Sequence, residues 1–436
     1  MTTKTSTKLD LHDIQGLVAR GYGSLPVACY LLFAVADRRA AQAQVGRWAE
    51  AVANAGSGHR EAATHVAFTA TGLAALGLPE DSLAGFSAEF LGGMAAPHRA
   101  RQLGDVDEAD PARWQWGGPA NPQVDGVVLL YARDEQELAE RERSAAGALT
   151  GNGLRLVKRL GTERLTDREP FGFRDGIAQP AVAGLGSAGN GQAVAAGEFV
   201  LGYRNGYGQL TDAPALARNG TYLVFRQLEQ DVDGFWRYVE DATRRPDGSV
   251  DDDRREQLAA KMVGRWRSGA PLVLAPDHDD PARAADNAFG YHDTDPTGLA
   301  CPLGAHIRRA NPRDSLDPDP GTAKSLAVND RHRLLRRGRA YGPEPRGLHF
   351  ICLSANIARQ FEFVQHTWLD NPNFRGRYDD TDPLVGSRLP YGDTFTEPAA
   401  PVRRRHVGLP RFVLPRGGGY FFLPGISALR SLAELP

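Results

Sequence analysis

Short apolar runs alternate with amphipathic stretches over the first 160 residues. The continuous apolar run at 27–35 predicts a buried strand, and Val45, Trp48 and Val52 at helical spacing predict a helix across 38–55. Further strands are expected at 65–69, 127–131 and 154–160, and helical stretches at 72–76, 86–99 and 134–149. The resulting order is strand, helix, two strands, helix, strand.

This order is typical of a ferredoxin-like domain, in which both helices cover one face of an antiparallel sheet. The second half repeats a more interrupted version, with strands at 222–227, 348–353 and 419–423 and helices at 232–243, 254–267 and 357–369. We therefore predict an α+β fold with two ferredoxin-like domains, 1–215 and 216–436, whose antiparallel sheets pack together. A length of 436 residues agrees with two domains.

Three segments are rich in glycine, proline, alanine or aspartate and predict loops. They span 184–197, 276–296 and 314–323. Long loops in a folded domain are more often functional than idle, so we expect these to border a pocket or cover its entrance.

The N-terminal segment has some features of a secretion signal, because basic residues precede the apolar run at 25–36. Asp10 and Asp13 lie in the would-be basic region, however, and Pro26 interrupts the run. We interpret the run as a core strand and expect a cytoplasmic protein. No stretch approaches the roughly 20 apolar residues that span a bilayer, so no membrane partner is expected.

The charge balance excludes a general attraction to polyanions. Lys+Arg is 51 and Asp+Glu is 53, so a nucleic-acid partner is not expected. The three cysteines contain no CxxC pair, which suggests neither a disulfide framework nor a zinc site. Arginine supplies nearly all the positive charge, and its planar fork suits carboxylates.

The segment from Cys301 to Arg313 combines a histidine with arginines and an Asn-Pro turn. His306, followed by Arg308 and Arg309, could bind an anionic cofactor through a neutral imidazole on a metal and guanidinium groups on carboxylates. A lone histidine is more often a hydrogen-bonded structural residue. The spacing alone leaves both interpretations open.

A second segment, 169–180, carries Asp175 between Gly172 and Gly176. Glycine permits close approach of the backbone, so a flat ligand could lie against this loop with the carboxylate above it. Asp-Gly is also an everyday turn dipeptide. Taken alone, this segment favours a plain turn.

Together the two segments resemble those of dye-decolorizing peroxidases. Gly172-Phe-Arg-Asp175-Gly176 is similar to that family's GxxDG motif, and the segment around His306 resembles its proximal-histidine motif. Five further segments resemble the family in the same order: Asp13-Ile-Gln15-Gly16, Phe68-Thr-Ala-Thr-Gly72-Leu, Gly220-Thr-Tyr-Leu-Val-Phe225-Arg, Arg333-Leu-Leu-Arg336-Arg-Gly-Arg-Ala-Tyr341-Gly342 and Phe361-Glu-Phe-Val-Gln365-His-Thr-Trp368. The family's fold, a pair of ferredoxin-like domains around haem b, agrees with the pattern above.

The resemblance implies one haem b per chain, in the C-terminal half, with His306 as axial ligand of the iron. It puts Asp175 and Arg336 on the opposite, distal face. Arg337 is one residue away from Arg336, and Ala340 stands where the family usually has proline. Gly176, Ile177 and Arg309 belong to the same two motifs, and we expect them to contact the cofactor along with Arg336.

The implied activity is reduction of hydrogen peroxide and oxidation of dyes, phenols or similar aromatic one-electron donors. Asp175 would act as distal acid/base, and Arg336 would stabilise charge as the O–O bond breaks. A carboxylate in this role predicts the highest activity under acidic conditions, since carboxylates titrate near pH ~4 unless perturbed. These motifs determine neither the natural reductant nor the oligomeric state.

Three further residues receive roles from their place in the family pattern. Asp382 is expected to accept a hydrogen bond from the His306 ring, with Asp380 as the alternative; a solvated loop is the competing interpretation. Trp368 and Tyr341 match residues through which electrons reach bulky donors, although a buried aromatic is more often simple core.

Two other functions remain compatible with parts of the pattern. A haem carrier or storage protein would need His306 but would leave Asp175 and Arg336 without a purpose. A metal-dependent hydrolase could use the acidic clusters at 292–295 and 379–382, because carboxylates suit hard cations. These clusters lie in Pro-rich turns, which favours solvated loops.

Overall fold

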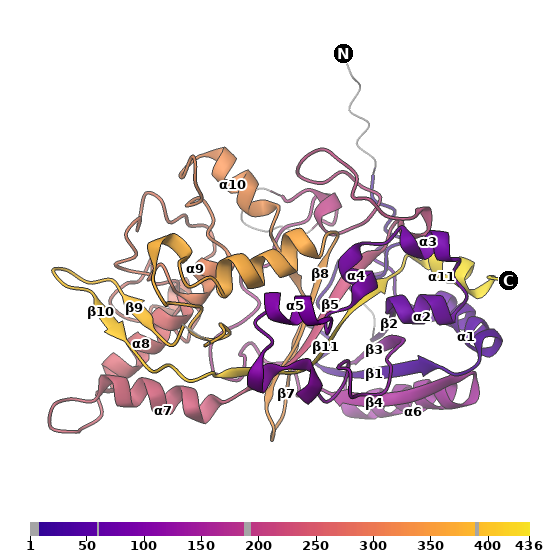
Figure 1. Ribbon diagram of the computed structural model, residues 1–436, viewed down its shortest axis with the longest axis horizontal. Helices are drawn as coiled ribbons and strands as arrows, with labels where there is room; N and C mark the ends of the chain where they lie inside the picture. The colour runs from indigo at the N-terminus through magenta and orange to yellow at the C-terminus, as the bar shows by residue number, and fades with distance from the viewer. Residues whose placement is uncertain (1–7, 59–60, 187–192, 389–391) are drawn as a thin grey trace, which may run out of the picture.

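A computed structural model describes residues 8–58, 61–186, 193–388 and 392–436 (Figure 1). Its strands are β1 Val27–Val35, β2 Ala62–Phe68, β3 Gly126–Ala132, β4 Leu154–Gly161, β5 Thr221–Gln230, β6 Leu335–Arg336, β7 Arg339–Tyr341, β8 Gly347–Ser354, β9 Phe395–Glu397, β10 Arg404–His406 and β11 Val413–Leu423. Its α-helices are α1 Arg38–Ala51, α2 Ala70–Ala75, α3 Glu80–Ala84, α4 Ala88–Gly92, α5 Pro97–Gln102, α6 Glu135–Gly151, α7 Val232–Thr243, α8 Asp252–Val263, α9 His306–Ala310, α10 Ala323–Asp330 and α11 Ile426–Ala433. Two π-helical segments, η6 Ala358–Glu362 and η7 Val364–Leu369, follow β8.

The main sheet is antiparallel and runs through both halves of the chain. Its strand order is β4-β1-β3-β2-β11-β5-β8-β6, with β7 also paired to β8. β4 forms one edge, and its sequence mixes apolar and basic residues. The two halves join where β2 meets β11, at the single pair Phe68 and Phe422. The predicted α+β class with antiparallel sheets is confirmed.

The two halves of the sheet also face each other across a shared core. On β1, Tyr30 and Leu32 point into this core, while Leu31 and Phe33 point toward the covering helices. The ring of Tyr30 lies 5.5 Å from that of Phe225 on β5, although β1 and β5 are not neighbours in the sheet. Burying a large apolar side chain stabilises the fold by about 1.5–3 kcal/mol, so this core contributes to holding the halves together.

Most predicted elements are present with small shifts in their ends. The strand at 27–35 and the helix at 232–243 have the predicted bounds. The predicted helix at 86–99 is divided into α4 and α5, because Gly93 adopts a φ of 75°. The predicted helix at 357–369 is π-helical. Of the predicted loop at 184–197, residues 187–192 lie outside the described part of the chain.

The last helix, α11, was not predicted and packs against α1 of the N-terminal half (Figure 1). Asp13 holds its first turn: Ser427 N–H donates to the carboxylate over 2.6 Å, and Ile426 N–H donates to the Asp13 carbonyl over 2.8 Å. The C-terminal strand and helix thus lie against the N-terminal half. The division at residue 215 stays a prediction.

Among the described residues, no helix is long and apolar enough to cross a membrane.

Candidate active site

A cavity of about 280 Å³ lies beside the C-terminal half of the sheet. One wall is the face of β5 and β8 that points away from the shared core. The other walls include the loop at 169–178, α9 and η7. The apolar lining includes Ile177, Leu228, Val263, Ile307, Leu334, Leu348, Phe350, Phe361, Val364, Leu369, Leu384 and Val385.

The short helix α9 brings His306 to the cavity, and a buried ion pair fixes where α9 begins. Arg308 donates to the Asp295 carboxylate over 2.9 Å and to the carbonyl of Cys301 over 2.6 Å. Asp295 also accepts from the backbone N–H of Cys301. Because Arg308 and Asp295 are almost fully buried, removing either partner would leave an unpaired charge. Arg308 thus braces the turn before His306.

Arg309 is not among the residues that line the cavity, and its contact with the cofactor stays a prediction. Its fully buried guanidinium donates to the backbone carbonyls of Trp368, over 2.8 Å, and Asn371, over 3.1 Å, and also to that of Asp380. Carbonyls that end a helix or turn carry partial negative charge and satisfy a buried cation without a carboxylate. Arg309 therefore joins α9 to the segment that follows η7.

The His306 ring is oriented by Asp382, as the family pattern implied. Nδ1 of His306 lies 2.9 Å from Oδ2 of Asp382, and the other carboxylate oxygen accepts the backbone N–H groups of Leu384 and Val385. Burial would raise the pKa of Asp382, but the charge of His306 holds it below its usual value. With Nδ1 engaged, Nε2 is the nitrogen available on the cavity side. Asp380, the alternative, instead binds Thr394 and Thr396.

The loop that carries Asp175 is shaped by Glu169. The Glu169 carboxylate accepts the backbone N–H groups of Phe171 and Phe173 at 3.0 and 2.9 Å, and the side-chain amide of Gln230 on β5 at 3.0 Å. Burial raises the pKa of Glu169. The indole N–H of Trp236 on α7 also donates to the Phe171 carbonyl. This loop, in the predicted N-terminal domain, is therefore fixed against the C-terminal half.

Asp175 lies at the tip of this loop. Gly172 and Gly176 have φ values of 97° and 79°, a backbone region that favours glycine. Asp175 and Ile177 line the cavity, whereas Gly176 is exposed and contributes the turn rather than the lining. The Asp175 side chain keeps 53% of its surface accessible, so it is free to meet a small molecule in the cavity.

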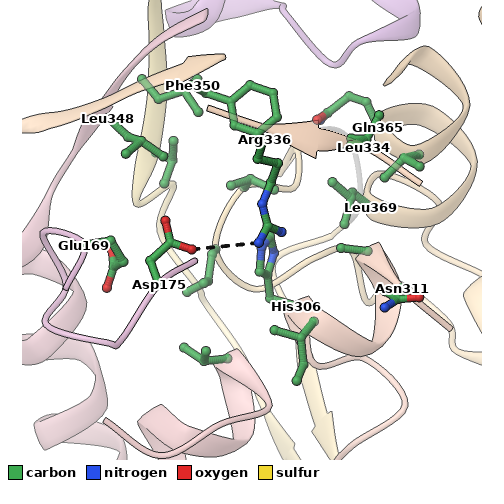
Figure 2. A pocket seen from close by; sticks show the side chains of 18 of the residues that line it. Glu169, Asp175, His306, Asn311, Leu334, Arg336, Leu348, Phe350, Gln365 and Leu369 are labelled. Atoms are coloured by element: carbon green, nitrogen blue, oxygen red, sulfur yellow. Dashed lines mark ion pairs between the residues drawn. The ribbon is translucent and has the colours of Figure 1, made fainter. Parts of the chain in front are cut away.

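The structure distinguishes the crowded arginines between 333 and 339. Arg336, on β6, faces the cavity, and its Nη2 lies 3.9 Å from Oδ1 of Asp175. Arg337 and Arg339 point the other way and donate to backbone carbonyls of the N-terminal segment 17–22. Figure 2 shows Asp175, Arg336 and His306 directed into one space from a loop, a strand and a helix.

Further arginines line the cavity without having been assigned from the sequence, among them Arg265 and Arg313. Arg265 is buried and Arg313 half-buried, and burial together with the charge of Arg313 lowers the pKa of Arg265 to about 10. Among the described residues, neither guanidinium has a carboxylate oxygen within 4.0 Å, the largest distance for an ion pair. Arg313 belongs to the Asn-Pro-Arg segment after His306, and this segment was the sequence feature that could have identified it as a site residue. Both guanidinium groups donate to backbone or amide oxygens, and Nε of Arg313 has no hydrogen-bond partner among the described residues. A cation with an unused donor suits an anionic ligand.

Trp368 and Tyr341 lie beside the cavity but do not line it. Trp368 is 5% exposed and packs on Phe363 and His332, with ring centroids 5.3 and 5.1 Å apart. Tyr341 is 7% exposed and stacks on His349 at 4.6 Å. Neither ring offers an open face to a bulky molecule.

The acidic clusters that suggested a hydrolase do not assemble. Asp295 is paired with Arg308, and Asp379 with Arg405. Across the described ranges, no group of three or more His, Cys, Asp or Glu side chains could hold a metal ion.

Comparison with known proteins identifies related chains over nearly the full length. No family model matches this chain. A dye-decolorizing peroxidase of Mycena epipterygia is 34% identical over 421 residues, which cover 85% of this chain and 76% of that protein. A structure from work on sulfoxidation by an engineered heme pocket of a dye-decolorizing peroxidase matches with a TM-score of 0.84 at 31% identity, over 98% of this chain and all of that one. A dye-decolorizing peroxidase in complex with 2,6-dimethoxyphenol matches with a TM-score of 0.82 at 31% identity, again over 98% and 100%.

Proposed function

The chain belongs to the dye-decolorizing peroxidase family, and from this we propose that its cavity binds one haem b between His306 on one side and Asp175 with Arg336 on the other. Membership makes the chain an oxidoreductase that acts on peroxide. The observation that carries the proposal is the meeting of these three side chains, from distant segments, at a single cavity.

The cavity suits haem in shape and in charge. Its apolar lining matches the flat macrocycle, and Arg265 and Arg313 would bind the propionates. The Nε2 atom of His306 would hold the iron, with Asp382 fixing the ring's orientation and keeping the proton on Nδ1. Bound haem supplies the redox chemistry that the side chains lack.

Asp175 and Arg336 divide the work on hydrogen peroxide. Asp175 accepts a proton from the oxygen of hydrogen peroxide that lies nearer the cofactor. It returns this proton to the other oxygen, which leaves as water. Arg336 stabilises the negative charge that develops as the O–O bond separates, and it stays protonated throughout. Their ion pair is loose, at 3.9 Å, so Asp175 can exchange this contact for one with peroxide.

The electron donors we propose are dyes, phenols and similar aromatic molecules. A related peroxidase has been crystallised with 2,6-dimethoxyphenol, and the named relatives decolorize dyes. A cytoplasmic location stays a prediction from the sequence.

The test is the absorption spectrum of the purified protein loaded with haem. We expect a Soret band that shifts rapidly when one equivalent of hydrogen peroxide is added. A haem carrier would show the band without the shift, and a metal-dependent hydrolase would show neither. If the Soret band did not shift at any pH, the proposed peroxidase activity would be wrong.

Replacing Asp382 with Asn should loosen the cofactor. An amide directs N–H toward the His306 Nδ1–H, so the ring loses its acceptor and its fixed orientation. We expect roughly a 10–100-fold loss of haem affinity, measured as the rate of haem transfer to excess haem-free globin. Asp380→Asn is the matched control, because that buried carboxylate binds Thr394 and Thr396 instead. Equal losses in both variants would contradict the assignment of Asp382.

Replacing Trp368 and Tyr341 together with Phe should impair oxidation of bulky dyes while sparing small donors. Both rings are buried beside the cavity, so they would pass electrons onward rather than stack on the dye. The measurement is kcat/KM for a large dye and a small phenol. Trp48→Phe, at an equally buried tryptophan in α1, controls for packing. Equal loss for both substrates would count against the relay.

A further inference from the structure

The sheet that walls the cavity carries a row of aromatic rings on its other face. On β8, Leu348 and Phe350 line the cavity, and His349 between them points into the core shared by the two halves of the sheet. His349 stacks on Tyr341 at 4.6 Å and meets the edge of Tyr30 at 5.7 Å. Only the thickness of the sheet separates these rings from the cavity.

The row continues through the shared core to a fifth ring. Tyr30 lies 6.1 Å from Tyr131, and Tyr131 lies 5.1 Å from Tyr22. Tyr30 and Tyr131 are fully buried, and Tyr22 is 8% exposed. Electron tunnelling weakens steeply with distance, so rings in near contact make a continuous path where an apolar core would not.

Tyr22 ends the row in a hydrogen bond to a buried imidazole. Its hydroxyl oxygen lies 3.0 Å from Nε2 of His65, a fully buried residue of β2. Nδ1 of His65 lies 3.2 Å from Oε1 of Gln15. Gly16 leaves room for the hydroxyl, because a Cβ at that position would collide with it.

The hydrogen-bond network assigns the proton on His65. Nε2 of Gln15 donates to the carbonyls of Val66, over 2.9 Å, and Pro424, over 3.0 Å, so its amide oxygen must face His65. An amide oxygen only accepts, so Nδ1 of His65 carries the hydrogen. Nε2 is then the acceptor in the contact with Tyr22, whose hydroxyl donates.

We propose that Tyr22 and His65 form a redox-active pair that supplies an electron to the peroxide-oxidised cofactor when no external donor is present. This rests on the proposed peroxidase function. Tyr22 loses one electron through Tyr131, Tyr30, His349 and Tyr341, and its phenol proton moves to Nε2 of His65. The product is a neutral tyrosyl radical beside an imidazolium.

The end of the row is where oxidation can be coupled to transfer of a proton. The Arg339 guanidinium, whose carbon lies 5.1 Å from the centre of the Tyr131 ring, also donates to the Tyr22 backbone carbonyl, so its charge does not distinguish the two rings. At Tyr22 the proton has an acceptor in place and need not cross the core. One electron from a later donor, with the proton returned by His65, restores the phenol. The pair would spare the cofactor and cavity side chains from oxidation.

The experiment is rapid-freeze electron paramagnetic resonance of the haem-loaded protein, mixed with one equivalent of hydrogen peroxide and no donor. We expect a neutral tyrosyl signal, with coupling to one exchangeable proton that disappears in D2O. Tyr22→Phe should remove most of the signal. The control is Tyr222→Phe, at a fully buried tyrosine of β5 outside the row, and it should leave the signal intact.

A second variant keeps the test decisive if Tyr22→Phe folds poorly. His65→Gln can accept the hydrogen bond but cannot take the proton, so the yield of radical should fall and the exchangeable coupling should be lost. A normal Soret shift with no tyrosyl signal, or with a signal unchanged in both variants, overturns this pair alone. An absent Soret shift would contradict the peroxidase and this pair with it.

Discussion

Asp175→Asn is expected to slow the reaction with hydrogen peroxide by at least about 10²-fold while haem remains bound. The amide keeps the size of the side chain and can still accept the backbone N–H of Gly176. It cannot take a proton from peroxide and return it. The measurement is the second-order rate of the Soret shift in a stopped-flow instrument, over a range of pH.

The control for this variant is Asp167→Asn. Asp167 belongs to the same loop, and its backbone carbonyl accepts the N–H of Asp175, but its side chain points to Arg174 at 3.7 Å. This variant should keep the parent rate. A rate for Asp175→Asn within a few-fold of the parent would remove Asp175 from the acid/base role, as would a neutral-to-alkaline optimum for every substrate.

His306→Ala is expected to abolish stable binding of haem. The variant removes the only imidazole among the described residues that line the cavity, and it leaves Asp382 buried without its partner. Buried charges without partners destabilise a fold by several kcal/mol, so the variant should also unfold at a lower temperature. The measurements are the ratio of haem to protein after gel filtration and the unfolding temperature without haem.

Added imidazole separates ligation from folding in this variant. A small neutral imidazole can enter the space left by the side chain and meet Asp382, so the Soret band should return in its presence. His366→Ala, at an exposed histidine on η7, should bind haem normally. A full complement of haem in His306→Ala without imidazole would exclude this residue as the ligand.

The main strands and several helices could be predicted because the surface that each one packs against is reflected in the spacing of its own apolar residues. The run at 27–35 is apolar on both faces of β1, since helices cover one face and the opposing sheet covers the other. Helix 232–243 shows one apolar stripe over its whole length. Short elements such as β9 and β10 carry too few residues for a period and were missed.

The candidate site was predictable in its motifs and only partly in its contacts. The resemblance selected His306, Asp175 and Asp382, which meet at one cavity or behind it. It also selected Arg309, whose guanidinium is turned toward backbone carbonyls, and it passed over Arg265 and Arg313. Arginine is long and flexible, so its position in a motif does not determine where its charge lies.

By itself, the sequence determined the class of fold, the order of most elements and the family, because periodicity and motif spacing are local properties of the chain. Only the tertiary structure decided that Arg333 and Arg336 face the cavity while Arg337 and Arg339 point away from it, since neighbouring residues of a strand point to opposite sides. It alone joined Tyr22 to His65, which lie 43 residues apart. Such pairs depend on how two sheet halves are stacked, and no local pattern records that stacking.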